Sequence, residues 1–272
     1  MNLSAYLDRI EYRGRLAPEY ETFAALHVAH ATHIPFENLD ILLGRRISID
    51  MAAIEAKLVD ARRGGYCFEQ NTLFAAVLRE LGFEVTALAA RVRKRQPGLL
   101  PRTHMCLCVR IGGLRYVADV GFGGEGLLMP VPMNGETVQQ YLWKYRLSQE
   151  ADGVWVLQSA GNGWNDLYAF TLEPQHDVDF MMANYYVSTY PESPFVRTLT
   201  VQLPAADCRQ ILRNRELVID NGSVFERVIL RDDDELLDML SSRFNLRFPA
   251  GTRFRFEEEP AEQYVAVNQL TK

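Results

Sequence analysis

The chain has 272 residues, of which 48% are apolar and 24% charged, a composition typical of a folded globular protein with one to three domains. Its formal net charge is −6, from 29 basic and 35 acidic residues, so we do not expect a nucleic acid as its partner. The first residues lack the apolar segment of a signal peptide, and no run approaches the roughly 18 apolar residues of a membrane span, so we expect a cytoplasmic location without membrane contact.

Residues 1–85 are expected to be helical. Pro18 suits the first position of a helix that Pro35 ends. Residues 51–60 are expected to form a second amphipathic helix. Residues 67–81 form a third, with Gly82 placed to terminate it.

From Val85 the apolar pattern changes to alternation, which predicts short strands. Five runs fit this pattern: 85–92, 104–111, 114–120, 142–147 and 153–159. Because turn residues separate several of them, we expect an antiparallel sheet or small barrel that extends to about residue 190.

The last third of the chain mixes both kinds of element. Asn221-Gly222 predicts a hairpin between 217–219 and 224–230, and Asp232 predicts the N-cap of a helix over 232–244. The expected fold class is therefore α+β, with domains at residues 1–85, 86–190 and 191–272.

Cys67 follows Arg62-Arg63-Gly64-Gly65-Tyr66 at the expected start of the third helix. The two glycines permit a sharp turn, and the free amides and dipole of a helix's first turn favour a thiolate. The alternative is a small buried residue without chemistry. With four cysteines and no export signal, a disulfide framework is not expected.

His104 and Asp119 are expected to share one face of a hairpin. The Gly112-Gly113 turn sets Ile111 opposite Leu114, and counting back places Cys106 opposite Asp119 with His104 on the same face. The two residues are then diagonal neighbours, about 7–8 Å apart at the backbone. A carboxylate that orients an imidazole leaves the other ring nitrogen free for a thiol, whereas the alternative is a solvent-exposed pair.

Two groups of possible zinc ligands lack the usual spacing. One is His104 with Cys67, Cys106 and Cys108, and the other is His27, His30 and His33 on one helix. We therefore expect no metal. The second and third cysteines are interpreted as core residues, and the three histidines as helix-packing or surface residues.

The chain also resembles the arylamine N-acetyltransferases, in segments that run in order along its length. They are Pro35-Phe36-Glu37-Asn38-Leu39, Arg63-Gly64-Gly65-Tyr66-Cys67-Phe68-Glu69, Asp119-Val120-Gly121-Phe122-Gly123, Ser188-Thr189 and Ser193-Pro194-Phe195. The resemblance implies an N-terminal helical bundle, an antiparallel β-barrel and a C-terminal α/β lid, with a core like that of cysteine proteases and transglutaminases. It also implies ping-pong transfer of acetyl from acetyl-CoA to an aromatic amine or hydrazine, an activity of xenobiotic metabolism.

The resemblance assigns roles to particular residues. Cys67 would be the acetylated nucleophile, His104 the base and Asp119 the residue that orients it. An acceptor pocket would be lined by Phe36, Val92, Thr103, Phe122 and Phe195. A loop with Gly121, Gly123 and Gly124 would lie near the CoA pyrophosphate, and Arg63 and Glu37 would form a structural ion pair.

A second candidate for phosphate contact is a cluster of basic residues, which are otherwise interpreted as a solvated loop. It comprises Arg91, Arg93, Lys94, Arg95 and Arg102. Three other functions share some of these features: a cysteine hydrolase or transglutaminase-like enzyme, an amide synthase acting on a carrier-bound polyketide, and a non-catalytic binding module. They differ in whether an acyl-enzyme forms and whether an amine outcompetes water for it. The sequence does not specify an oligomeric state.

Overall fold

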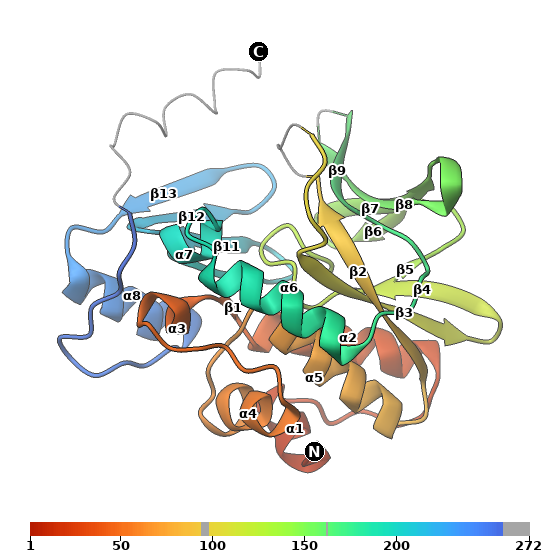
Figure 1. Ribbon diagram of the computed structural model, residues 1–272, viewed down its shortest axis with the longest axis horizontal. Helices are drawn as coiled ribbons and strands as arrows, with labels where there is room; N and C mark the ends of the chain where they lie inside the picture. The colour runs from red at the N-terminus through yellow and green to blue at the C-terminus, as the bar shows by residue number, and fades with distance from the viewer. Residues whose placement is uncertain (94–97, 162, 258–272) are drawn as a thin grey trace.

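The structure, a computed structural model, describes residues 1–93, 98–161 and 163–257. Its α+β class confirms the prediction. In Figure 1 the N-terminal helices (red and orange) lie below a barrel of yellow and green strands, and a second sheet (blue) lies beside that barrel. Within these three ranges, no helix has the length and apolar character needed to cross a bilayer.

The N-terminal part is helical, as predicted. Its helices are α1 (Leu3–Arg9), α2 (Tyr20–His33), α3 (Leu39–Leu42), α4 (Met51–Ile54) and α5 (Cys67–Glu80). Two details differ from the prediction. Helix α2 begins at Tyr20 with Glu19 as its cap, so Pro18 lies outside it, and the expected helix over 51–60 changes after Ile54 to a π-helical segment, Glu55–Asp60.

Helix α5 is the central element of this part. It begins at Cys67, and Gly82, with φ +88°, lies just beyond its end, as predicted. Its apolar positions Leu73, Phe74 and Val77 are fully buried in the core that α5 shares with α2 and the first barrel strands. That burial fixes the helix, and with it Cys67, against the barrel.

Eight strands form a nearly closed antiparallel barrel in the order β5-β4-β3-β2-β9-β8-β7-β6. They are β2 (Glu84–Val92), β3 (His104–Ile111), β4 (Leu114–Ala118), β5 (Val131–Pro132), β6 (Val138–Gln140), β7 (Trp143–Gln149), β8 (Trp155–Gly161) and β9 (Gly163–Phe170). Cys106 and Cys108 lie in its core, as predicted.

The hairpin of β3 and β4 has the predicted register. Ile111 pairs with Leu114, and the ladder continues to Leu107 opposite Ala118. Strand β4 ends there, so Asp119 lies beyond the strand, and the predicted pairing of Cys106 with Asp119 does not form. The reason is that the Asn71 side chain takes the two groups that would form the next ladder bond, accepting from the Val120 N–H and donating to the Met105 carbonyl. The Asp119 backbone N–H points away from β3 and donates to a histidine of α2, His27, at 3.1 Å.

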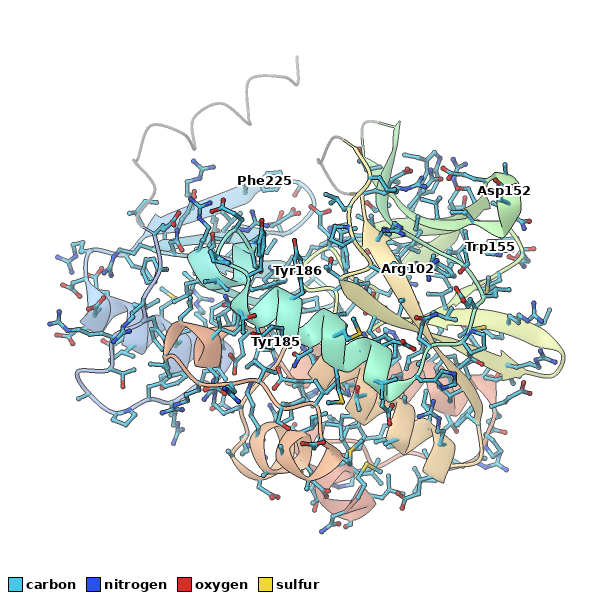
Figure 2. All side chains as sticks on the ribbon, viewed as in Figure 1. Arg102, Asp152, Trp155, Tyr185, Tyr186 and Phe225 are labelled. Carbon is cyan, nitrogen blue, oxygen red and sulfur yellow. The ribbon has the colours of Figure 1, made fainter. Side chains whose placement is uncertain are left out.

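The prediction that strands continue to about residue 190 was wrong. Helix α6 (Asp177–Thr189) occupies that region and crosses the front of the molecule in Figure 1. Asp179 accepts from the backbone N–H of His176 at 2.9 Å and so closes the first turn. Only one side of α6 is buried. Tyr185 and Tyr186, labelled in Figure 2, are exposed side chains of this helix.

The C-terminal part contains a five-stranded sheet in the order β1-β10-β11-β12-β13. Its elements are β1 (Phe36–Glu37), α7 (Pro194–Arg197), β10 (Thr200–Pro204), β11 (Arg209–Arg213), β12 (Glu216–Asp220), β13 (Phe225–Ile229) and α8 (Asp233–Phe244). The hairpin around Asn221-Gly222 and the Asp232 cap of α8 are both as predicted. Strand β1 comes from the N-terminal part, a pairing that the sequence did not indicate.

Candidate active site

Cys67 occupies the first position of α5 and is almost fully buried, with 3% of its surface exposed. The helix begins here because Tyr66 is extended and its backbone N–H donates to Glu69 Oε2 at 3.1 Å, closing the first turn. The free amides and positive dipole end of that turn stabilise negative charge on sulfur. Cys67 Sγ also lies 3.9 Å from the carbonyl oxygen of Thr103, the residue before His104.

The two glycines before this cysteine allow close approach of another segment, and neither has the left-handed backbone that a sharp turn would need. A Cβ at Gly64 would lie 2.1 Å from the carbonyl oxygen of Pro35, and one at Gly65 would lie 2.8 Å from Glu69 Oε2. The Gly65 N–H donates to that same Pro35 oxygen at 3.2 Å. The glycines therefore hold the 35–37 segment against the start of α5.

His104, the first residue of β3, and Asp119 form a buried pair. His104 Nε2 donates to Asp119 Oδ2 at 2.7 Å, and both side chains are at least 96% buried. Burial alone would lower the pKa of His104, but the charge and hydrogen bond of Asp119 outweigh it and raise that pKa to about 10. Burial opposes the ionised form of Asp119 too, yet His104 holds the pKa of this carboxyl below its usual value.

The thiol of Cys67 lies near enough to the His104 ring to add to the rise in that ring's pKa. Because Nε2 is bonded to Asp119, Nδ1 is the nitrogen available to the thiol. The structure therefore brings the three residues Cys67, His104 and Asp119 together. Such an arrangement can exchange a proton between sulfur and imidazole while the carboxylate stabilises the imidazolium.

Asn71 links the three segments that carry these residues, and the sequence analysis did not identify it. Its Nδ2 donates to Met105 O at 2.8 Å and to Asp119 Oδ1 at 2.9 Å, and its Oδ1 accepts from the Val120 N–H at 3.1 Å. Asn71 lies four residues after Cys67, one helical turn along the same face. That spacing was the available signal.

Tyr168 is a second neighbour that the sequence did not single out. Its ring lies 4.8 Å from that of His104, centroid to centroid, and its hydroxyl is buried without a hydrogen bond of normal geometry. Burial and the nearby charge of Asp119 raise the pKa of this phenol well above its usual value. The phenol is therefore neutral beside the His104–Asp119 pair.

Four of the five residues predicted for an acceptor pocket lie against Cys67, His104, Asp119 or a residue next to one of them. The Phe122 ring lies 5.2 Å from His104, and the Phe36 and Phe195 rings lie 5.9 Å apart, with Phe195 against Tyr66. Thr103 provides the carbonyl beside the cysteine sulfur described above. The fifth, Val92, pairs in the barrel with Tyr168, the residue whose ring packs on His104.

A cavity of about 10 Å³, scarcely the volume that one water needs, adjoins Asp119. Phe36 and Phe122 line it, whereas Val92, Thr103 and Phe195 do not. This cavity, as the described residues form it, is too small for an aromatic ring. The role of these five residues in acceptor binding stays a prediction.

The glycine loop after Asp119 uses part of its backbone internally. Gly121 N–H donates to Asp119 Oδ1 at 2.9 Å, and Gly124 N–H donates to Gln202 Oε1 of β10. Gly123, with φ +92°, also approaches Gln202 closely. These two amides are therefore engaged, and a phosphate on this loop would need other donors or a change of partners.

The basic cluster is also paired. Arg93 bonds Glu150 through both terminal nitrogens, at 2.6 and 2.8 Å, and Arg102 bonds Glu173 at 3.1 Å. Arg91 donates to the carbonyl of Leu100. Lys94 and Arg95 lie outside the described residues. Arg93 and Arg102 are therefore paired with carboxylates, whereas the Arg91 guanidinium bonds a neutral carbonyl and keeps its charge.

A buried ion cluster lies against the first turn of α5. Arg63 Nη2 lies 2.6 Å from Glu37 Oε1, which confirms the predicted ion pair. Lys57, on the π-helical segment, lies 2.8 Å from Glu69 and 3.2 Å from Asp40. Burial alone would lower the pKa of Lys57, but the surrounding carboxylates raise it. The cluster connects the 37–40 segment with the turn that positions Cys67.

Neither group of possible metal ligands is assembled. In the described part of the chain, no three His, Cys, Asp or Glu side chains are arranged to hold a metal ion. His27 and His30 are fully buried and His33 is partly exposed, in keeping with packing and surface roles.

Comparisons with known proteins point to one family. A family model described as N-acetyltransferase matches residues 19–253. The arylamine N-acetyltransferase of Mycolicibacterium smegmatis is 41% identical over 253 residues, which cover 90% of this chain and 92% of that protein. The arylamine N-acetyltransferase / N-hydroxyarylamine O-acetyltransferase of Salmonella typhimurium is 38% identical over 255 residues, 90% and 88% of the two chains. The structure of Mycobacterium marinum arylamine N-acetyltransferase in complex with CoA matches with a TM-score of 0.84 at 38% identity, covering 90% and 92%.

Proposed function

Because the chain belongs to the arylamine N-acetyltransferase family, we propose that it transfers acetyl from acetyl-CoA to the nitrogen of aromatic amines or hydrazines through a thioester on Cys67. The observation that carries the proposal is the arrangement of Cys67, at the start of α5, beside the buried His104–Asp119 pair. In this proposal the three residues are a catalytic triad. Acetyl-CoA is the donor substrate and no metal takes part.

The reaction begins when His104, whose pKa is raised by Asp119, takes the proton of the Cys67 thiol and leaves a thiolate beside the imidazolium. The thiolate attacks the thioester carbonyl of acetyl-CoA. A new C–S bond forms to Cys67, the C–S bond to CoA breaks, and the departing CoA sulfur takes the proton of His104. The enzyme is then acetylated and His104 is neutral.

The second half-reaction reverses these roles. An aromatic amine is neutral at pH 7, so its lone pair can attack the acetyl carbonyl. His104 removes the proton from the attacking nitrogen, and the C–S bond to Cys67 breaks to restore the thiolate. Acetylation removes the cysteine charge, one of the groups that raise the pKa of His104, so the ring more readily stays neutral and available to take a proton when the amine arrives.

Water must be kept away from the acyl-enzyme, or the protein becomes a hydrolase. Phe122 and Tyr168 pack on His104, and Cys67 is almost fully buried. These contacts support transfer over hydrolysis. A reactive free thiol and a CoA donor both suit a reducing compartment, so the cytoplasm is the location that we propose.

Mass spectrometry after mixing with acetyl-CoA tests the proposal. We expect an adduct of about 42 Da on Cys67 that disappears when an arylamine is added and amide appears. Cys67→Ser is expected to form no adduct. Cys208, a partly exposed thiol, provides the matched control, and Cys208→Ser should be acetylated like the wild type.

Two results contradict the proposal. If the adduct forms on another cysteine, or if no adduct forms, Cys67 is not the nucleophile. If the adduct is lost in water as fast as it is lost in the presence of an arylamine, the protein is a hydrolase instead.

A further inference from the structure

His27 connects helix α2 to both ends of the glycine loop. The ring is fully buried, and its edge packs on Phe74 with centroids 5.6 Å apart. Nδ1 lies 3.0 Å from the carbonyl oxygen of Leu128, and Nε2 lies 3.1 Å from the backbone nitrogen of Asp119. One imidazole therefore holds the first and last residues of the segment 119–128.

The two partners fix the state of this ring. A carbonyl oxygen only accepts a hydrogen bond and a backbone N–H only donates one, so Nδ1 must carry the proton and Nε2 must be the acceptor. His27 is thus a neutral imidazole of one tautomer. Burial agrees with this, since it lowers the pKa of His27 to about 4, although the charge of Asp119 opposes the shift. His30, on the same helix, has its pKa lowered to about 3, mainly by burial.

The Asp119 carboxylate and the Asp119 backbone have different supports. The carboxylate is held by His104, Asn71 and the Gly121 N–H, all described above. The backbone N–H points away from β3, and His27 Nε2 is its acceptor. The position of Asp119 where β4 ends therefore depends on a residue of α2, 92 positions earlier in the chain.

We propose that His27 is a positioning residue for the reaction: its Nε2 anchors the backbone of Asp119 and its Nδ1 closes the base of the loop 119–128. The inference rests on the proposed function, because it assigns His27 an effect on the Cys67–His104 pair through Asp119. Loss of the Nε2 contact leaves a buried N–H without a partner, so Asp119 shifts and holds the His104 imidazolium less well. The Cys67 thiolate is then less stabilised.

Two substitutions separate the halves of this ring. An Asn side-chain amide reaches the place of Nδ1, and a Gln amide reaches the place of Nε2. His27→Asn can still donate to Leu128 but offers nothing to Asp119. His27→Gln can still accept from Asp119 but loses the contact with Leu128. The pair keeps the polarity of the site while removing one bond at a time.

The test is the pH profile of Cys67 alkylation by iodoacetamide, together with steady-state transfer. We expect His27→Asn to shift the alkylation midpoint upward by about 0.5 to 1 pH unit, the size expected for one lost hydrogen bond, and to lower kcat. His27→Gln should restore the wild-type midpoint. His33→Asn, on the exposed part of the same helix, is the matched control and should leave both readouts unchanged.

The inference is overturned if His27→Asn keeps the wild-type midpoint, or if both variants shift it equally, since either result makes His27 a packing residue only. Should His27→Asn fail to fold, nitrogen NMR of the wild-type ring decides. A protonated Nε2 between pH 6 and 8 contradicts the anchor, and an unprotonated Nε2 coupled to the Asp119 amide supports it. Absence of the acetyl adduct in the wild type would instead refute the proposed function, so the two failures are distinguishable.

Discussion

Replacing Asn71 with alanine is expected to damage stability and reactivity together, because this side chain joins α5 to β3 and to the residues after β4. The change removes hydrogen bonds to Met105 O and the Val120 N–H and one to the Asp119 carboxylate. A neutral hydrogen bond contributes about 1 kcal/mol and one to a charged group about 1.5–3 kcal/mol. We therefore expect a loss of about 3–5 kcal/mol, a large share of the roughly 5–15 kcal/mol that stabilises a typical protein.

Reactivity should change in a defined direction. Asn71 helps to hold the pKa of Asp119 down, so its removal raises that pKa and weakens the hold on the His104 imidazolium. The midpoint for alkylation of Cys67 should then move to higher pH. Urea unfolding followed by tryptophan fluorescence measures the first effect, and iodoacetamide kinetics across pH measure the second.

Thr72→Ala is the matched control for this experiment. Thr72 is the next residue on the same helix, is partly buried, and makes only a weak contact with the Met105 sulfur at 3.7 Å. It should cost less than about 1 kcal/mol and leave the alkylation profile unchanged. If Asn71→Ala behaves like Thr72→Ala, Asn71 does not couple the helix to the barrel and the reasoning fails.

Two further predictions follow from the same site. Gly121→Ala should cost about 1–3 kcal/mol of stability and slow Cys67 alkylation, because its Cβ would lie 2.7 Å from Cys67 Cα. Gly135→Ala is the control: its Cβ meets no atom within 4 Å and bears only the strain of a φ of +80°, so alkylation should be unchanged. Equal alkylation rates in both variants would contradict the clash. His104 has a raised folded-state pKa of about 10 against about 6.5 when unfolded, so its contribution to stability is complete below pH 6.5 and is lost as the pH rises to 10. The urea midpoint of the wild type should fall over that range more steeply than that of His104→Gln, and parallel curves would argue against the raised pKa.

Local patterns in the sequence predicted elements whose ends are determined locally. The Gly112-Gly113 turn was sufficient for the register of β3 and β4, and Asp232 was sufficient for the start of α8. The start of α5 at Cys67 was equally clear. In each case a turn or cap residue acts on neighbours within a few positions, so no distant contact was needed.

The errors occurred where distant residues decide the structure. The pairing of Cys106 with Asp119 fails because Asn71, from α5, takes the Val120 N–H and the Met105 carbonyl that would continue the ladder. Gly64 and Gly65 suggested a turn, but they serve the close approach of Pro35. No local pattern contains that information.

The histidine–aspartate pair could be derived by counting along the hairpin, whereas the residues that pack against it and hydrogen-bond to it could not. Asn71 and Tyr168 carry no motif of their own, and their importance appears only when α5 and β9 are seen against β3. The roles of the aromatic and glycine residues in binding substrates remain predictions.

The segment that begins at Pro35 has a consequence for how the polypeptide assembles. Asn38 Nδ2 donates to the carbonyls of Phe195 and Thr198, its Oδ1 accepts from the Thr200 N–H 162 positions later, and β1 completes the sheet through β10. During synthesis on the ribosome these early groups have no partners until more than two thirds of the chain has been made. A nascent chain released before residue 200 would keep an unpaired edge beside its reactive cysteine, so the thiol gains its finished surroundings only late in folding.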